Sequence, residues 1–221
     1  MAIKLENLNK KYGKKPVLFD INIEIPTGSF TMLNGVSGSG KSTLLSIIGG
    51  IESATSGKVI IDGQDVSSLK GSERTNFYRH KIGFIFQGFY LQPQLTIGEN
   101  IALMGTFAGM AKKEREARTK ELAEMLGIAE VLDSLPAEVS GGQAERACAA
   151  RAMFMHPEII LADEPTNNLD PENAKNVIEM LKNIQREASA TMIIASHDPM
   201  VKEYATQILY IKDGHITSEE K

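Results

Sequence analysis

The segment Gly35-Val-Ser-Gly-Ser-Gly-Lys-Ser-Thr43 has the residue types and spacing of a phosphate-binding loop, because it matches G-x-x-x-x-G-K-[ST]. Its glycines let the backbone turn tightly, so that successive N–H groups can point at one anion. A helix starting near Lys41 would aim its positive dipole end at the same anion. Lys41 can bridge the β- and γ-phosphates, and the Ser42 hydroxyl can ligate Mg²⁺. The segment predicts a nucleoside-triphosphate site formed by Gly35, Ser37, Gly38, Ser39, Gly40, Lys41, Ser42 and Thr43.

Further polar residues directly follow short apolar runs, which read as buried strands. They are Gln87, Asp163, Glu164 and His197. Because ligands of parallel sheets bind at the carboxyl ends of the strands, we expect these groups at one edge. Asp163 is the expected acidic partner of Mg²⁺, and Glu164 can polarise an attacking water as a general base.

Gln87 and His197 have less specific signals. Gln87 can contact Mg²⁺ or the attacking water. His197 can hydrogen-bond the γ-phosphate or orient that water. A lone histidine after a strand is more often structural, but its position at the predicted sheet edge favours a catalytic role.

A second glycine-rich segment, Val139-Ser-Gly-Gly-Gln143, precedes another helical run. Ser140 can cap that helix, while Gly141 and Gly142 leave its N-terminus open to an anion. The alternative is an ordinary helix start that contains glycine. Spacing alone does not bring this segment to the first site.

Tyr12 lies shortly before the phosphate loop, among Lys10, Lys11, Lys14 and Lys15. Its ring could stack on a nucleotide base, and from spacing alone a structural tyrosine is an equal alternative. The lysines are typical of a solvated turn.

The surrounding elements indicate an α/β fold. Residues 3–27 alternate apolar and polar side chains, which predicts antiparallel strands. Buried strands are expected near 30–33, 82–86, 159–162 and 191–195, and they alternate with helices, as in a mainly parallel sheet. Asp170 and Pro171 predict a helix start, with the apolar stripe Ala174, Val177, Ile178, Leu181 and Ile184. A short strand at 59–61 and a hairpin at 208–216 complete the prediction.

Between residues 88 and 137 the strand signals vanish, which predicts a helical lobe. Leu122, Met125, Leu126 and Ala129 share one helical stripe, and residues 112–118 read as a solvated face. We therefore expect one domain, with residues 1–87 and 138–221 as the core and residues 88–137 as a helical subdomain.

Composition narrows the function classes. The chain has 221 residues, a net charge of −4 and one cysteine, Cys148, for which a small buried side chain is expected. The acidic balance disfavours nucleic acid as a partner. No apolar run reaches the roughly 18 residues of a membrane span, and no signal peptide is evident. These features predict a cytoplasmic protein that could reach a membrane only through another protein.

Taken together, these motifs resemble the ATP-binding-cassette ATPases over nearly the whole chain, from Tyr12 to Gly214. In that resemblance Gln87 is the Q-loop glutamine, Ser140-Gly-Gly-Gln143 the family signature and His197 the switch histidine. Asn167-Asn-Leu-Asp170 corresponds to the D-loop, which adds Asp170 to the expected nucleotide contacts. The resemblance implies a P-loop NTPase core with an N-terminal antiparallel β subdomain and an inserted α-helical subdomain.

The resemblance also implies partners. It implies ATP with Mg²⁺, a head-to-tail dimer with a second copy, and an integral membrane permease subunit. Each ATP would lie between one phosphate loop and the other subunit's Ser140-Gly-Gly-Gln143. Tyr12 falls where the family places its adenine-stacking ring.

A narrower resemblance is to the lipoprotein-release and macrolide-export branch. It rests on residues 63–69, Glu73-Arg74, 82–91 and 95–100. The sequence departs from the usual pattern of that branch at two places. The D-loop begins with Asn167-Asn168, where the branch usually has Gly or Ala before Asn or Leu. The signature helix reads Ala144-Glu145-Arg146, where Gln-Gln-Arg is usual. Neither removes an expected catalytic group.

The leading hypothesis is an ATP-hydrolysing motor subunit that moves a membrane partner docked around residues 87–110. A soluble cassette ATPase that acts as a scaffold or assembly factor is the main alternative. Nucleic-acid-associated cassettes usually carry long insertions, zinc motifs or tandem cassettes, which this chain lacks. A phosphate-loop kinase would have no use for the second glycine segment.

Overall fold

The computed structural model describes residues 2–167 and 169–217. One sheet is antiparallel, with strand order β2-β1-β4-β5. Its long strands pair residue by residue, for example Ile3 with Ile25 and Leu5 with Ile23, as the alternation in residues 3–27 predicts. The strands are β1 (Ile3–Tyr12), β2 (Lys15–Ile25), β4 (Ser56–Ile61) and β5 (Gln64–Asp65).

The other sheet is the mainly parallel one, with order β10-β9-β3-β8-β7-β6. All its neighbours run parallel except β9 and β10, which form the expected C-terminal hairpin. Its strands are β3 (Phe30–Asn34), β6 (Ile82–Ile85), β7 (Ile159–Asp163), β8 (Thr191–Ser196), β9 (Gln207–Lys212) and β10 (His215–Thr217).

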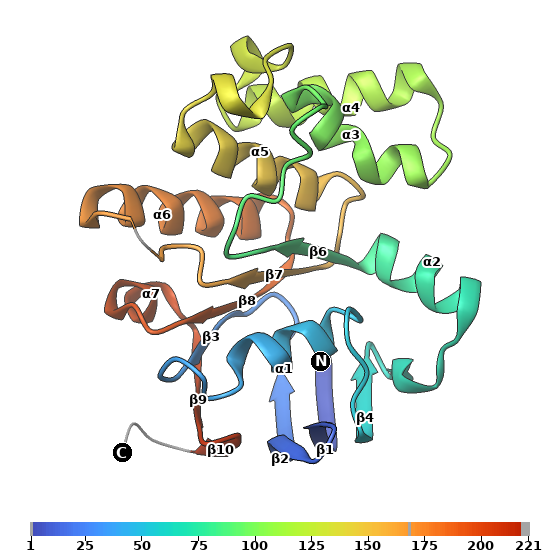
Figure 1. The fold of residues 1–221 in the computed structure, drawn as a ribbon, viewed down its shortest axis with the longest axis vertical. Helices are drawn as coiled ribbons and strands as arrows, with labels where there is room; N and C mark the ends of the chain where they lie inside the picture. Colours follow the sequence, from blue (N-terminus) through green and yellow to red (C-terminus); the bar gives the residue numbers. More distant parts are fainter. Residues whose placement is uncertain (1, 168, 218–221) are drawn as a thin grey trace.

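Helix α1 (Lys41–Ile48) lies between the two sheets (Figure 1). Its buried side chains, Leu44, Leu45, Ile47 and Ile48, join one apolar core with the inner faces of β1, β2 and β4. The same core takes every second residue of the parallel strands, such as Leu161 on β7. The helix that carries the phosphate loop is therefore anchored on two sides.

The alternate residues of these strands face a second core on the opposite side of the sheet, where the remaining large helices pack (Figure 1). On β7, Ile160 and Ala162 belong to this second core. The helices on this side are α3 (Ile97–Phe107), α4 (Lys112–Met125), α5 (Gly141–Met153), α6 (Pro171–Glu187) and α7 (Pro199–Tyr204), with 3₁₀ turns at Ala129–Val131 and Pro136–Glu138. A further 3₁₀ turn, Val66–Ser68, buries Val66 in the first core.

Two predicted helix starts are confirmed. The Asp170 carboxylate accepts hydrogen bonds from the N–H groups of Glu172 and Asn173, and Pro171 opens α6. Ser140 and Gln143 form a reciprocal capping box at the start of α5. The predicted stripe of α6 is buried throughout.

The sequence did not predict α2 (Gly71–Lys81), and the structure explains why. None of its residues is fully buried, so it has no apolar stripe to detect. The helix ends directly before β6 and projects at the side of the molecule opposite α6 and α7 (Figure 1).

Two details of the helical lobe were predicted wrongly. Arg118 is not part of a solvated face but is buried, and it donates to the carbonyls of Met153 (2.9 Å) and Phe154 (3.3 Å). Met125 is exposed at the last residue of α4, so Ala129 lies beyond the helix that was to carry the stripe. Leu122 and Leu126 are buried, as expected.

Helix α5 packs against α3 and α4 as well as against β6. The division into a core and a subdomain at residues 88–137 stays a prediction. Within residues 2–167 and 169–217, none of the helices has the length and apolar character needed to cross a membrane.

Candidate nucleotide-binding site

The phosphate loop runs from the end of β3 to the first turn of α1. Gly40 takes the N-cap position with φ of 109°, a conformation that favours glycine, and no side chain caps the helix. The first N–H groups of any α-helix have no intrahelical partner, and here no N-cap side chain occupies them either. This arrangement suits a multiply charged anion.

Close packing holds the loop in place. A Cβ atom on Gly35 would lie 2.3 Å from the carbonyl oxygen of Ile211 and 2.7 Å from Ser39 Oγ, so only glycine fits there. The Gly214 N–H donates to the Ser39 carbonyl at 3.1 Å. Ser39 Oγ is buried without a hydrogen-bond partner. The C-terminal hairpin thus supports the back of the loop.

Lys41 is 5% exposed and its ammonium group has three oxygen partners. It donates to the carbonyls of Gly35 (2.7 Å) and Val36 (3.2 Å), and it pairs with Glu164 Oε1 at 3.0 Å. The charge is therefore held over the loop, where a phosphate oxygen could replace one of these partners.

Glu164 lies between Lys41 and His197. His197 Nδ1 is 3.0 Å from Glu164 Oε2, and the imidazole is largely exposed. Glu164 has φ of 46°, and its N–H donates to the carbonyl of Ala195 on β8 at 2.8 Å. Left-handed backbone at a glutamate is strained and recurs at functional sites. Here it turns the carboxylate out of β7 toward the loop.

Asp163 is the neighbouring carboxylate at the end of β7. Ser42 Oγ donates to its Oδ1 at 3.0 Å. Burial raises the pKa of Asp163, and the nearby Glu164 charge adds to this, while the Ser42 hydrogen bond and Lys41 oppose it. The Asp163 carboxylate lacks enough nearby positive charge, and the Ser42 hydroxyl lies beside it. Both groups offer the oxygen ligands that Mg²⁺ prefers.

No group of three or more histidine, cysteine or acidic residues that could hold a metal by itself occurs in residues 2–167 and 169–217. Mg²⁺ sites that use substrate phosphates need only one or two carboxylates. Asp163 and Ser42 therefore suffice as the protein's donors, with Gln87 nearby.

A pocket of about 500 Å³ brings most of the sequence-predicted groups together. It is lined by Val17, Val36, Ser37, Gly38, Gly40, Lys41, Ser42, Thr43, Gln87, Glu164, Asn167 and His197. We call it the phosphate pocket. Val17, Val36 and Asn167 were not predicted as lining residues. Asn168, part of the expected D-loop, lies outside the described residues.

Tyr12 lies near this pocket, at the end of β1. Its hydroxyl donates to the Glu52 carboxylate at 2.6 Å, and Lys10 Nζ lies 4.7 Å from the ring centroid. Burial, with Glu52, raises the pKa of Tyr12, and the Thr43 side chain opposes the shift. The Tyr12 hydroxyl therefore lies close to Thr43 of the phosphate loop. Lys10 is partly buried against Glu52, whereas Lys11, Lys14 and Lys15 are exposed as expected.

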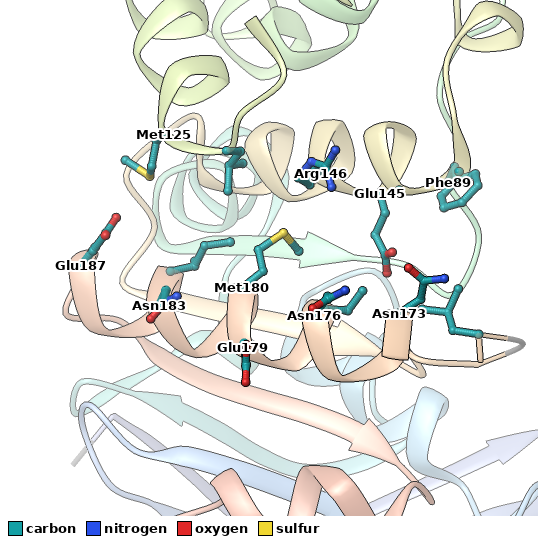
Figure 2. A pocket seen from close by; sticks show the side chains of 16 residues that line it. Phe89, Met125, Glu145, Arg146, Asn173, Asn176, Glu179, Met180, Asn183 and Glu187 are labelled. Carbon is teal, nitrogen blue, oxygen red and sulfur yellow. The ribbon is translucent and has the colours of Figure 1, made fainter. Parts of the chain in front are cut away.

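The second glycine segment does not share the phosphate pocket. Gly141 and Gly142 instead line a separate hollow of about 630 Å³ between α5 and α6, which we call the α5–α6 cleft (Figure 2). Asp170 lies at the start of α6, where hydrogen bonds from Asn173 lower its pKa. Within one chain, the glycine-rich start of α5 therefore lies outside the phosphate pocket, which is formed at the glycine-rich start of α1.

Sequence reasoning missed Glu145 as an unusual group. Its side chain reaches from α5 toward Asn173 and Asn176 on α6 (Figure 2). Burial raises the pKa of Glu145 to about 7, against the opposing charge of Arg146. The sequence did mark this position, because Ala144-Glu145-Arg146 stands where the related branch usually has Gln-Gln-Arg.

Comparison with known proteins agrees with this geometry. A profile described as ABC transporter matches residues 18–167. The putative hemin import ATP-binding protein HrtA of Staphylococcus epidermidis is 40% identical over 220 residues, which cover 98% of this chain and 99% of that one. The macrolide export ATP-binding/permease protein MacB of Aggregatibacter actinomycetemcomitans is 41% identical, and the chain spans 34% of its length.

The solved dimeric structure of MJ0796, a bacterial ABC transporter cassette, superimposes with a TM-score of 0.89 at 39% identity, covering 99% of this chain and 98% of that one. A second MJ0796 dimer, in a post-hydrolysis state bound to ADP and Pi, gives a TM-score of 0.88. The predicted α/β fold and the resemblance to the macrolide-export branch are thereby confirmed. The chain belongs to the ABC transporter family and is one of its ATP-binding, ATP-hydrolysing cassettes.

Proposed function

We propose that the phosphate pocket binds the triphosphate of ATP and that Glu164 is the general base of hydrolysis. The observation that carries this is the contact of Glu164 with both Lys41 and His197 inside one pocket. An incoming phosphate competes with Glu164 for the Lys41 ammonium group. The released carboxylate is then free to polarise a water, and His197 supports the charge that develops on the phosphate.

Further contacts in this proposal come from the loop and its neighbours. The phosphates are held by backbone N–H groups of residues 35–43, including that of Ser39, and by the Ser37 and Thr43 side chains. Tyr12 stacks on the adenine. Gln87 contacts Mg²⁺ or the attacking water. Support comes from the open helix start and from the joint position of these groups around the phosphate pocket.

Asp163 and Ser42 would hold Mg²⁺, with Gln87 as a further oxygen donor. The ion supplies charge neutralisation for the phosphate oxygens. The hydrogen bond between Asp163 and Ser42 already places both oxygens together, and the raised pKa of Asp163 indicates that a cation would stabilise its carboxylate.

The chain would act as a head-to-tail dimer with a second copy. Each ATP then lies between one phosphate loop and the Ser140-Gly-Gly-Gln143 segment of the other subunit, with Asp170 at the same interface. The separation of the two glycine-rich helix starts in one chain supports this, as do the dimeric MJ0796 structures. A ligand shared by two subunits favours the closed dimer by mass action.

A membrane permease subunit would dock beside α2 and α3. A hollow of about 490 Å³ there combines aromatic and apolar groups with two arginines; it is lined by Gly49, Gly50, Arg74, Thr75, Tyr78, Arg79, Ile82, Phe84, Met104 and Phe107. We call it the α2–α3 cleft. Phe107 is 66% exposed, which suits a protein partner. The chain would thus sit at the inner face of the cell membrane without spanning it.

The system is proposed to be of the export or mechanical type, and the name of MacB supports export. The name of HrtA says import instead, so the relatives' names do not agree on the direction of transport. The cargo and its direction therefore have to be found by experiment.

Substitution of Glu164 by glutamine tests the proposal. Glu164→Gln keeps the shape and hydrogen bonding of the side chain but removes the base. We expect ATP hydrolysis to fall by about 10²–10⁴-fold, the usual share of a general base, while ATP binding persists. The variant should accumulate as an ATP-dependent dimer in light scattering.

Glu116→Gln is the matched control, because that carboxylate lies on the exposed face of α4, away from the pocket. Hydrolysis in Glu164→Gln at the rate of the parent would refute the role of the base. Removal of Mg²⁺ by a chelator should abolish hydrolysis, and full activity without a divalent ion would refute the metal assignment.

A further inference from the structure

The Tyr12 side chain is bound at its hydroxyl, although 45% of the residue is exposed. Tyr12 is the last residue of β1, and its hydroxyl lies 2.6 Å from each oxygen of the Glu52 carboxylate, to which it donates. Lys10 Nζ lies over the ring, 4.7 Å from its centroid. Protein groups therefore occupy the hydroxyl edge and one face of the ring. A flat nucleotide base can cover only the other face.

Lys10 holds the Glu52 carboxylate in place as well. Its Nζ pairs with Glu52 Oε2 at 2.8 Å and donates to the Ser53 carbonyl at 2.8 Å. Burial alone would raise the pKa of Glu52, but the hydrogen bonds from Lys10 and Tyr12 outweigh burial and lower that pKa. Glu52 therefore remains a charged acceptor for the Tyr12 hydroxyl at neutral pH, and hydrogen bonds to charged acceptors are the stronger kind.

The turn that carries Glu52 continues from the end of α1. The N–H groups of Ile51 and Glu52 donate to the Ser46 carbonyl on this helix, at 2.9 and 3.1 Å respectively. At the first turn of the same helix, the Thr43 side chain lies close to the Tyr12 hydroxyl. Because α1 begins at the phosphate loop, these contacts hold the ring at a defined place relative to that loop.

Helix α2 contacts the same turn. Arg74 donates to the Gly50 carbonyl at 2.9 Å, and its guanidinium lies 5.4 Å from the centroid of the Tyr78 ring. Gly50 has φ of 70°, and a Cβ atom on it would lie 2.4 Å from that ring, so only glycine fits there. Glu52 is thus presented by a backbone that both α1 and α2 hold.

The order of the Tyr12 side chain has a consequence for affinity. An exposed tyrosine without a partner samples several rotamers, and ordering such a side chain only when a ligand arrives weakens binding. A ring that is already ordered avoids this cost. Because the ring would contact the base and not the phosphates, the gain is expected only for ligands that carry a base.

We propose that Glu52, supported by Lys10, is a positioning residue that holds the Tyr12 ring in place for the adenine base. Glu52 acts through the Tyr12 hydroxyl and does not itself contact the nucleotide. The inference rests on the proposed function, because it requires a nucleotide in the phosphate pocket with its base against Tyr12. It adds that affinity for the base depends on the carboxylate bound to the Tyr12 hydroxyl, whereas affinity for the phosphates does not.

Binding of ADP and of pyrophosphate to the full chain, measured by calorimetry with Mg²⁺, tests this assignment. ADP carries the base, whereas pyrophosphate offers only the phosphates. We compare the parent with Glu52→Ala, Glu52→Gln, Tyr12→Phe and the double variant Tyr12→Phe/Glu52→Ala. Glu6→Ala is the matched control, because Glu6 also pairs with a lysine of β1, Lys4 at 2.8 Å, but lies six residues before Tyr12 on that strand.

We expect Glu52→Ala to raise the Kd of ADP by about threefold to tenfold, the usual cost of ordering one side chain on binding, and to leave that of pyrophosphate unchanged. Glu52→Gln should recover part of the loss, because its amide oxygen still accepts from the hydroxyl. Glu6→Ala should bind both ligands like the parent. Unchanged ADP affinity in Glu52→Ala overturns the inference. An equal loss for pyrophosphate also overturns it, because Glu52 would then act on the phosphate loop.

Tyr12→Phe keeps the ring but removes the hydroxyl, so it tests the same link even if Glu52→Ala fails to fold. Its loss of ADP affinity should match that of Glu52→Ala, and the double variant should lose little more than either single variant. Fully additive losses would mean that Glu52 acts by another route and would overturn the inference. Unchanged ADP affinity in Tyr12→Phe overturns it as well.

Tyr12→Ala separates this inference from the proposed function. Loss of the whole ring should raise the Kd of ADP by about 10–100-fold, the usual cost of removing an aromatic side chain that stacks on a base. ADP binding as tight as in the parent would contradict the stacking of Tyr12 on adenine. A clear loss in Tyr12→Ala without any loss in Glu52→Ala would leave the stacking intact and overturn only the positioning role.

Discussion

At the scale of single residues, the site depends on Lys41, whose ammonium group is bound by protein oxygens that a phosphate can replace. Lys41 donates to two loop carbonyls and to Glu164, so its charge is compensated before any nucleotide arrives. Phosphate oxygens can replace these partners with charge-assisted hydrogen bonds, which are about twice as strong as neutral ones. Lys41 therefore links nucleotide binding to the release of Glu164.

Lys41→Ala should weaken ATP binding by about 10–100-fold, the loss expected for one or two hydrogen bonds to a charged group. Calorimetric titration with ATP measures the change. Lys58→Ala removes an exposed lysine of β4 and serves as the control. Equal affinity in Lys41→Ala and the parent would remove this lysine from the phosphate contacts.

Glu145 makes a prediction about pH. Its pKa is raised to about 7 in the folded protein, above that of an unfolded glutamate, because the side chain is largely buried beside α6. Between about pH 4.5 and 7 the folded state therefore binds more protons than the unfolded state, and this residue's contribution to stability falls as the pH rises. Above pH 7 the full penalty of a buried carboxylate remains.

Glu145→Gln removes that penalty, so its Tm should exceed that of the parent by a margin that grows from pH 5 to pH 8. Thermal unfolding at several pH values measures the margin. Glu116→Gln, on the exposed face of α4, should show no such trend. A margin that is constant with pH would contradict the raised pKa.

At the scale of elements, loops are held by buried polar side chains. Asn100 on α3 donates to the carbonyls of Gln92 (3.1 Å), Leu95 (3.0 Å) and Thr96 (2.9 Å), and it accepts from the Gln92 N–H (2.7 Å). One fully buried amide thus satisfies four backbone groups between β6 and α3. The segment that carries Gln87 depends on it for a defined path.

Asn100→Ala should lower the free energy of unfolding by about 3 kcal/mol, because it leaves the Gln92 N–H and the Leu95 carbonyl without their hydrogen-bond partner and opens a cavity at a fully buried position. Urea unfolding gives the value. Asn183→Ala, at an exposed position on α6, should change it by less than about 0.5 kcal/mol, as is usual for surface substitutions. A similar small effect at both positions would show that water replaces the Asn100 bonds.

At the scale of the whole molecule, the proposed partner sites lie in different places. The phosphate pocket and the α5–α6 cleft involve the carboxyl ends of the strands and the starts of α5 and α6. The α2–α3 cleft lies beside the far end of α1 and α2. Helix α1 begins at the phosphate loop and ends at Gly49 on the border of that cleft. ATP and a membrane partner can therefore occupy the molecule together.

Phe107→Glu should disrupt docking of the membrane partner without affecting the isolated ATPase, because it places a charge on an exposed aromatic position of the α2–α3 cleft. A pull-down from detergent-solubilised membranes of the source cells measures the recovered permease. Leu135→Glu, at another exposed apolar position, is the control. Equal recovery with Phe107→Glu would place the docking surface elsewhere.

The limits of sequence reasoning are visible in particular elements. Helix α2 was missed because a helix without a buried face leaves no periodic pattern. Arg118 was misread because its partners, the carbonyls of Met153 and Phe154, lie 35 and 36 residues away. For Glu145 the departure from Gln-Gln-Arg marked an unusual position, but its burial beside α6 depends on residues such as Asn173 and Asn176, which are far away in the chain.

The sequence by itself determined the chemistry of this protein, because phosphate loops, strand-end carboxylates and helix caps act through residues close in the chain. It also determined the main strands, the first two through alternation with a period of two and those of the parallel sheet through short apolar runs. Only the tertiary structure decided which groups meet: Lys41 with Glu164, Tyr12 with Glu52, and Arg151 with the loop of Gln87. Such contacts join segments that are far apart in the chain, and packing of α5, α6 and the two sheets, rather than any local pattern, sets their distances.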